Sequence, residues 1–226
     1  GLAPTEWQAV QLSLLVAFWA SLLSLPLAVL VAYALARWQF WGCQLLNICV
    51  HLPLILPPVV TGYVLLLVFG QTAPVGRFLN DTFGIVLAFR WTGAVLAAAL
   101  MAFPLMVRAI RLAIEAVDPK LEQAATTLGA GPIRVFLTIT VPMMAPGLVA
   151  GVVLAFAKAM GEFGATITFV ANIPGQTQTL PSAIYAFLQV PGGDASAVRL
   201  LVLSVFISVL ALALSEWMAR RVVHGT

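Results

Sequence analysis

Five long apolar stretches dominate the pattern of hydrophobic and polar positions along the chain. They run over about 10–36, about 45–69, between Arg90 and Arg108 with a continuation to Ala113, about 146–170, and between Arg199 and Glu216. An α-helix needs roughly 20 residues to cross the hydrocarbon core of a bilayer. All five stretches meet this length, the third and fifth if flanking arginines reach the headgroups. The pattern predicts an all-α membrane protein, a polytopic helical bundle of about five to six spans.

A sixth apolar stretch, Leu180 to Val190, is too short to cross a bilayer. We expect a re-entrant or surface helix there, and a single transmembrane domain over residues 1–226. The composition agrees, because 62% of the residues are hydrophobic and 8% are charged, whereas about one quarter of a soluble domain is charged. A disordered chain and a disulfide scaffold are excluded by the high apolar content and by the two cysteines.

The net charge of +3 comes from basic residues that form no basic stripe, so we predict contact with membrane lipid and no nucleic-acid partner. With the N-terminus outside and the C-terminus cytosolic, seven basic residues fall on the cytosolic side and three outside. The seven are Arg37, Arg108, Arg111, Lys120, Arg134, Arg220 and Arg221, and the three are Arg77, Arg90 and Arg199. Cytosolic loops carry the excess of Lys and Arg, which favours this orientation.

Prolines are frequent inside the predicted spans. Pro26 and Pro104 are expected to interrupt the first and third spans, and the run 52–58, which contains Pro53, Pro57 and Pro58, to break the second. Carbonyl groups freed by such breaks need partners from neighbouring helices or from water in a cavity. Ordinary kinking accounts for a single proline. The cluster at 53–58, followed by Thr61 and Gly62, favours a segment that lines a path or forms a hinge.

The loop at about 115–142 reads as two short helices at the cytosolic membrane surface. Asp118 is a suitable N-cap before Pro119, and Gly129 a suitable C-terminal residue, of the first helix. A second helix is expected from Pro132 to just before Pro142. The first helix carries an apolar face of small and branched residues, Leu121, Ala124, Ala125 and Leu128. This face suits docking into a groove on a partner protein; a surface helix resting on the membrane or on its own bundle is the alternative.

The same loop resembles the EAA loop of ABC importer permeases. The run 123–129 reads Gln-Ala-Ala-Thr-Thr-Leu-Gly, and after nine residues the run 139–142 reads Ile-Thr-Val-Pro. The family pattern is Glu-Ala-Ala, three residues, Gly, nine residues, then Ile-x-Leu-Pro. Gln123 stands where the family has glutamate, with Glu122 one place earlier, and Val141 replaces leucine. The resemblance implies that the loop docks on an ATPase through Leu121, Glu122, Gln123, Ala124, Ala125, Leu128, Gly129, Ile139 and Pro142.

Similarity to molybdate permeases extends over nearly the whole chain, including the segments 51–60, 157–169, 172–175 and 180–185. Permeases for sulfate, thiosulfate and tungstate carry similar segments. The resemblance implies the type I ABC importer permease fold and a multi-pass location in the cell inner membrane. The partners it implies are a second copy of the chain, two cytosolic ABC ATPase subunits, and a periplasmic or extracellular oxyanion-binding protein. The implied mechanism is alternating access along a homodimer interface.

Lys158 and Glu162 are charged residues inside the predicted fourth span, four positions apart and so expected on one helix face. A structural ion pair and a face that lines the path both fit this spacing. The other candidates for the path or gate are small or hydroxyl residues or prolines: Pro57, Pro58, Thr61, Gly62, Gly161, Gly164, Thr166 and Thr168. Close helix packing explains each of the small and hydroxyl residues equally well.

No catalytic function is predicted. The chain has no Gly-x4-Gly-Lys-Ser/Thr loop and no recognisable serine–histidine–acid set, so ATP and Mg are expected on a partner subunit and no cofactor in this chain. Cys43, Cys49 and His51 lack a fourth ligand and a zinc spacing, so no metal site is predicted. A channel or secondary transporter that needs no ATPase is the alternative of a different class. Such proteins often contain an internal repeat, and no clear repeat is visible here.

Overall fold

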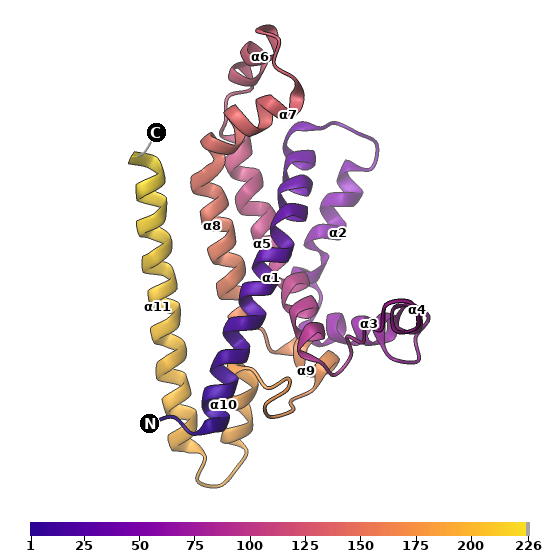
Figure 1. Ribbon diagram of the computed structural model, residues 1–226, viewed down its shortest axis with the longest axis vertical. Helices are drawn as coiled ribbons and strands as arrows, with labels where there is room; N and C mark the ends of the chain where they lie inside the picture. Colours follow the sequence, from indigo (N-terminus) through magenta and orange to yellow (C-terminus); the bar gives the residue numbers. More distant parts are fainter. Residues whose placement is uncertain (225–226) are drawn as a thin grey trace.

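The computed structural model describes residues 1–224, and within them the chain forms helices and loops with no strand. The helices are α1 (Pro4–Arg37), α2 (Cys43–Ile55), α3 (Pro58–Phe69), α4 (Pro74–Phe83), α5 (Trp91–Glu115), α6 (Pro119–Thr127), α7 (Pro132–Val135), the π-helical segment η1 (Phe136–Thr140), α8 (Val141–Met160), α9 (Gly164–Val170), α10 (Leu180–Leu188) and α11 (Asp194–His224). The long helices run side by side, with the two chain ends at opposite ends of the bundle (Figure 1). The predicted all-α bundle is confirmed.

Four helical segments are long and apolar enough to cross a membrane: α1, α5, the continuous run from Pro132 to Met160, and α11. The consecutive helices α2 and α3 pass the same test together but are bent by 114°. Counting this bent pair as one span gives the five spans that the sequence predicts. Since many large apolar side chains remain exposed, including those along α11, the bundle presents an oily surface of the kind that faces lipid or another apolar partner.

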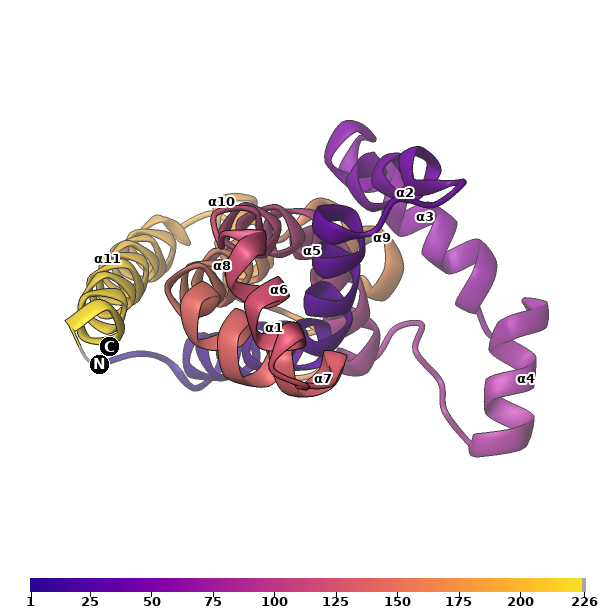
Figure 2. The same ribbon diagram turned by 90° about the horizontal axis from the view of Figure 1, so that it is seen from above.

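Small residues allow the central helices to pack closely. α5 packs against both α1 and α8, and its contact positions include Ala94, Ala97 and Ala98, all fully buried. On α1 the alanines Ala17 and Ala28 are likewise inaccessible. Without large side chains between them the helix backbones approach closely, which is how helices associate inside membranes. Viewed from above, α4 and α11 lie at opposite edges of this centre (Figure 2).

The effect of the prolines differs from the prediction at two of three places. Pro26 lies within the continuous α1 and Pro104 within the continuous α5, so the expected interruptions there are wrong. Neighbouring helices in a membrane bundle can compensate the single hydrogen bond that a proline removes. The break in the second span is confirmed, and it falls at Leu56-Pro57, whereas Pro53 stays inside α2. Adjacent prolines at 57 and 58 remove two consecutive N–H donors, and the residue before a proline avoids helical geometry.

The fourth span also differs from its predicted range. The helix that begins at Pro132 does not end before Pro142 but continues through η1 into α8. Pro142 follows directly on the π-helical turn, where Val141 N–H donates to Phe136 O five residues back. The regular bonding pattern is already changed at that point, so the missing N–H of Pro142 does not end the helix.

At its far end the fourth span stops at Met160, and α9 begins after a short break at 161–163. Glu162 accounts for the restart, because its carboxylate accepts the N–H of Ala165 at 2.8 Å, in the manner of an N-cap. The fourth span is therefore broken, and its residues 164–170 form a separate short helix instead of the last turns of a long one.

Two short helices flank the long spans: α10 lies near the end of the bundle that holds the N-terminus, and α4 lies at the side of the bundle, beyond α3 (Figure 1). α10 confirms a helix at the apolar stretch from 180, and it is too short to span. α4 was not predicted, although its residues Val75, Phe78 and Phe83 recur on one face at helical spacing and are exposed. Ten residues with a polar opposite face carry too weak a hydropathy signal to be recognised as a span.

Candidate functional site

The helix α6 and its following turn project from the bundle at the end opposite the N-terminus (Figure 1), and we call residues 118–133 the α6 tip. The predicted cap is confirmed, since the Asp118 carboxylate accepts the N–H of Lys120 at 2.9 Å. The helix ends at Thr127, and Gly129 follows with a φ of +90°. Such a left-handed conformation is accessible to glycine at little cost, so Gly129 terminates α6 as the sequence predicts.

The apolar face of α6 is open to its surroundings. Leu128 is 90% exposed, Leu121 and Ala124 are exposed, and Ala125 is half-buried. No residue of α6 is buried. Ile133, on α7, is 76% exposed beside them. Leucine and isoleucine side chains so exposed on one protruding element form a surface that suits an apolar groove on a partner. The alternative that this face rests on its own bundle does not agree with the exposure.

The last two residues of the EAA resemblance lie elsewhere. Ile139 is half-buried in η1, and Pro142 is exposed in the first turn of α8. They belong to the continuous helix that leads into the bundle, whereas Gln123 is exposed on α6. The structure therefore brings 121–129 together on the tip and separates Ile139 and Pro142 from it.

Glu122 points away from the exposed apolar face and into a polar junction. Its Oε1 lies 3.3 Å from Nη2 of Arg37 and accepts the hydroxyl of Thr140 at 3.0 Å. Arg37 Nη2 also donates to the carbonyl groups of Ile114 and Val117. The sequence analysis treated Arg37 only as an orientation signal and did not single out Thr140. No local pattern reveals these contacts, because the partners lie 85 and 18 positions from Glu122.

The candidate path residues on α3 and α9 meet each other. A Cβ atom added to Gly62 would lie 2.4 Å from the carbonyl oxygen of Ala165, and one added to Gly164 would lie 2.5 Å from Cβ of Pro58. Both distances are shorter than real Cβ contacts allow. The glycines therefore permit two short helices, each following a break in a span, to touch along their backbones.

The hydroxyl groups at this contact differ in how they are satisfied. Thr166 donates to the carbonyl of Phe163 at 2.9 Å, and Thr168 donates to that of Gly164 at 2.9 Å. Thr61 is 5% exposed, and its buried Oγ1 has no hydrogen-bond partner among residues 1–224. A buried hydroxyl without a partner costs free energy. Thr61 is therefore the threonine of this set whose hydroxyl does not contribute a hydrogen bond to the fold.

Lys158 and Glu162 were predicted to lie on one face of a helix, and this prediction is wrong. α8 ends at Met160, so Glu162 lies in the break, buried and bonded to the backbone of Ala165. Within residues 1–224, the ion pairs closer than 4 Å do not include Lys158 with Glu162. The structural role of Glu162 is to start α9, and Lys158 is half-buried in the last turn of α8.

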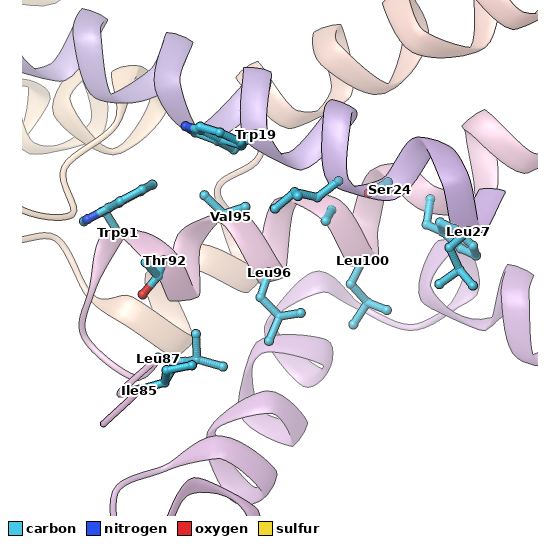
Figure 3. Close-up of a pocket in the computed structure, with 13 residues that line it drawn as sticks. Trp19, Ser24, Leu27, Ile85, Leu87, Trp91, Thr92, Val95, Leu96 and Leu100 are labelled. Atoms are coloured by element: carbon cyan, nitrogen blue, oxygen red, sulfur yellow. The ribbon is translucent and has the colours of Figure 1, made fainter. Parts of the chain in front are cut away.

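A cavity of about 780 Å³ lies between α1, α5 and the segment 85–87, and Figure 3 shows its lining. The lining includes Trp19, Trp91 and Leu96, and its hydroxyl groups belong to Ser24 and Thr92. Ser24 donates to Ala20 O at 2.6 Å, and Thr92 is directed to Val86 O at 3.5 Å. Apart from the indole N–H groups of Trp19 and Trp91, the rest of the lining is hydrocarbon, which does not fit a hydrated oxyanion.

The cysteines and the nearby histidine make no metal site in the described part of the chain. No group of three His, Cys, Asp or Glu side chains comes close enough there to hold an ion. Cys43 and Cys49 are free thiols, and His51 Nδ1 lies 2.8 Å from the carbonyl of Asn47. His51 is therefore engaged with its own helix.

The chain is similar over nearly its whole length to permeases of bacterial transport systems. The permease ModB of the molybdenum transport system of Escherichia coli K12 is 58% identical over 97% of this chain and 96% of its own length. The corresponding protein of Haemophilus influenzae is 53% identical over 96% of this chain and 94% of its own. The sulfate permease CysT of Salmonella typhimurium is 34% identical over 97% of this chain and 80% of its own.

Solved structures of ABC importers share the fold. A chain of the bacterial alginate ABC transporter, solved with its alginate-bound periplasmic protein, superposes with a TM-score of 0.77 at 16% identity, over 97% of this chain and 80% of its own. The profile described as "Binding-protein-dependent transport system inner membrane component" matches residues 24–224. The bundle with broken inner helices and a projecting tip is therefore that of a type I ABC importer permease, and the chain belongs to the family of binding-protein-dependent transport system inner membrane components.

Proposed function

We propose that this chain is the membrane-spanning permease subunit of an ATP-driven oxyanion importer whose substrate is molybdate. The observation that carries the proposal is the 58% identity to a molybdenum transport permease over nearly the full length of both chains. The identity to the sulfate permease is only 34%. Sulfate, thiosulfate and tungstate are the competing substrates, since all four are tetrahedral dianions.

The α6 tip is the proposed docking element for a cytosolic ABC ATPase. Its exposed leucines and the small side chains of Ala124 and Ala125 would enter a groove on the ATPase. Two ATPases would serve a pair of permease chains, with ATP and Mg bound on the ATPase subunits. Closure of the ATPases would move the tips together and reorient the spans attached to them, which is a rigid-body form of coupling.

The proposed orientation puts the α6 end of the bundle in the cytosol. Arg37, Lys120, Arg134, Arg220 and Arg221 all lie at or near this end, together with the basic residues of the last turns of α5. Arg199 lies in the first turns of α11, at the end that holds the N-terminus, whereas Arg77 lies on α4 at the side of the bundle and Arg90 directly precedes α5. An excess of basic residues on the cytosolic side favours an external N-terminus and a cytosolic C-terminus.

The contact between α3 and α9 is the proposed moving part of the path. Both helices follow breaks in spans, and irregular backbone at membrane depth is tolerated where it is buried in protein or lines a water-filled cavity. Molybdate would pass between two permease chains and arrive from an external oxyanion-binding protein. The alginate importer, solved in complex with a periplasmic protein, supports a partner of this kind.

Reconstitution tests the function. The chain would be placed in lipid vesicles with its partner ABC ATPase and a molybdate-loaded binding protein. We expect molybdate uptake that requires ATP and exceeds uptake of tungstate and sulfate. Leu128→Asp should abolish co-purification of the ATPase, whereas Leu212→Asn, a change of an exposed residue in α11, should not. Uptake by the permease alone would support a channel or secondary transporter and overturn the proposal.

A further inference from the structure

The polar junction at the base of α6 is the feature that the proposed function leaves unused. It joins Arg37, the last residue of α1, Glu122 of α6, and Thr140, the last residue of η1. One carboxylate oxygen of Glu122 meets Arg37 Nη2 at 3.3 Å and the Thr140 hydroxyl at 3.0 Å. The side chains of Arg37 and Glu122 are each only 14% exposed, and Thr140 is fully buried.

Arg37 also completes the end of α5. Its Nη2 donates to Ile114 O at 3.0 Å and to Val117 O at 2.7 Å. The last carbonyl groups of a helix have no partner within the helix and carry partial negative charge. A guanidinium group with several donors in a fixed plane can satisfy them and a carboxylate together. Arg37 Nε is buried without a partner, so the position of this cation depends on the contacts of Nη2.

Little else holds α6 to the bundle. The helix has no buried residue, and only the segment 116–118 joins it to α5. Among the described residues, the side-chain hydrogen bonds of Thr126 and Thr127 stay within α6, whereas those of Glu122 reach α1 and η1. One carboxylate thus connects the projecting helix to Arg37 at the end of α1 and to Thr140 directly before α8, and Arg37 extends the connection to the end of α5.

We infer that Arg37, Glu122 and Thr140 are positioning residues that fix α6 to three spans, so that a push on the α6 tip moves the spans instead of tilting α6 alone. The inference rests on the proposed docking of an ATPase at the tip. Without the junction, the ATPase would still bind Leu121 and Leu128, but α6 would rotate about its connection at 116–118. ATP would then be hydrolysed with less movement of the path.

The test compares ATP hydrolysis with molybdate uptake in the reconstituted complex. Glu122→Gln keeps the shape and removes the charge, and Thr140→Val removes the hydroxyl at nearly constant volume. Both are expected to lower molybdate uptake per ATP hydrolysed by about fivefold or more, while the ATPase still co-purifies. Thr140→Ser keeps the hydroxyl group and should behave like the wild type. Glu216→Gln is the matched control, because Glu216 pairs with Arg220 within α11 alone.

Two outcomes separate this inference from the proposed function. If the ATPase co-purifies and all variants keep the wild-type uptake per ATP, the junction does not couple, and the inference is overturned while the docking proposal stands. If the wild-type chain does not bind the ATPase, the proposed function itself fails. Melting temperatures in detergent check folding, since a purely structural role would lower the melting temperature and leave the uptake per ATP unchanged.

Discussion

At the scale of single residues, glycines without a side chain are as important for the contact between α3 and α9 as the side chains around them. Gly62 and Gly164 let α3 and α9 touch at their backbones, and Thr61 beside them is buried with an unpaired hydroxyl. All three residues were predicted as path candidates from their small or hydroxyl side chains, and Thr61 and Gly62 also from the prolines before α3. The sequence alone did not predict that α3 and α9 meet, because the contact joins segments about a hundred positions apart and depends on two helix breaks.

Gly62→Ala is the residue-scale prediction. The new methyl group would lie 2.4 Å from Ala165 O and 2.8 Å from Cβ of Thr168, so α3 and α9 must separate. Overpacking of this kind costs about 1–3 kcal/mol, and we expect a lower melting temperature and loss of molybdate uptake. Gly131→Ala is the control for the melting temperature alone, since its Cβ would meet nothing within 4 Å but the residue belongs to the α6 tip. Unchanged stability and uptake in Gly62→Ala would show that the contact is looser than described.

At the scale of elements, length and hydropathy predicted the spans well and the breaks poorly. Continuous apolar runs identify α1, α5 and α11 because a lipid-facing helix needs no polar face. Pro26 and Pro104 misled the prediction, since a helix interior in a membrane bundle tolerates single prolines. The break before α9 was not predicted, because a polar residue and not a proline causes it. A buried carboxylate, Glu162, begins a new helix there, while its position in an apolar run suggested a span that continues.

The connection between α1 and α11 provides the element-scale prediction. α11 has only two buried residues, Ala197 and Leu200, but Arg199 donates to Glu6 through Nη2 at 2.6 Å and Nε at 3.3 Å. Glu6 is fully buried and also accepts the N–H of Ala3. Glu6→Gln should loosen the first turn of α1 and the start of α11, because the charge-assisted contact between the buried Glu6 carboxylate and the 46% exposed Arg199 is lost.

Hydrogen exchange measures this effect. Amide hydrogens in 4–10 and 194–201 should exchange severalfold faster in Glu6→Gln than in the wild type, with little change in α6. Asp194→Asn, which changes an acidic residue in the first turn of α11 that forms no ion pair among the described contacts, is the control. Equal exchange in all three proteins would mean that packing alone holds α11 in place.

At the scale of the whole molecule, one chain leaves large apolar side chains exposed on α3 as well as on α11. The α3–α9 contact lies to one side of the bundle in Figure 1, and exposed side chains on α3 include Val59, Val60 and Tyr63. A path bordered by one chain on one side only is incomplete. The four long spans, and the placement of the two chain ends at opposite ends of the bundle, were predictable from the sequence; a second permease chain was implied only by resemblance.

A mass measurement tests the proposed pairing. The purified chain in mild detergent, after subtraction of the bound detergent, should have twice its 24.0 kDa mass, and a Tyr63→Cys variant on a background without Cys43 and Cys49 should form disulfide-linked dimers on oxidation. A cysteine in place of Leu214, on the exposed face of α11, should crosslink far less. A monomeric mass with no crosslinking at 63 would contradict the homodimer.

The sharp turn between α2 and α3 limits how much of the bilayer this part of the chain can cover. The 13 residues of α2 reach about 20 Å and the 12 residues of α3 about 18 Å. With a bend of 114° the two ends of the pair are only about 21 Å apart, which is less than the roughly 30 Å of hydrocarbon in a bilayer. Fatty-acid tails cannot satisfy the backbone groups left at this corner. The exposed backbone groups at this corner must therefore be covered by other protein or hydrogen-bonded to water. Lipid tails are then excluded from the corner, and the edge of the lipid-facing surface lies outside it.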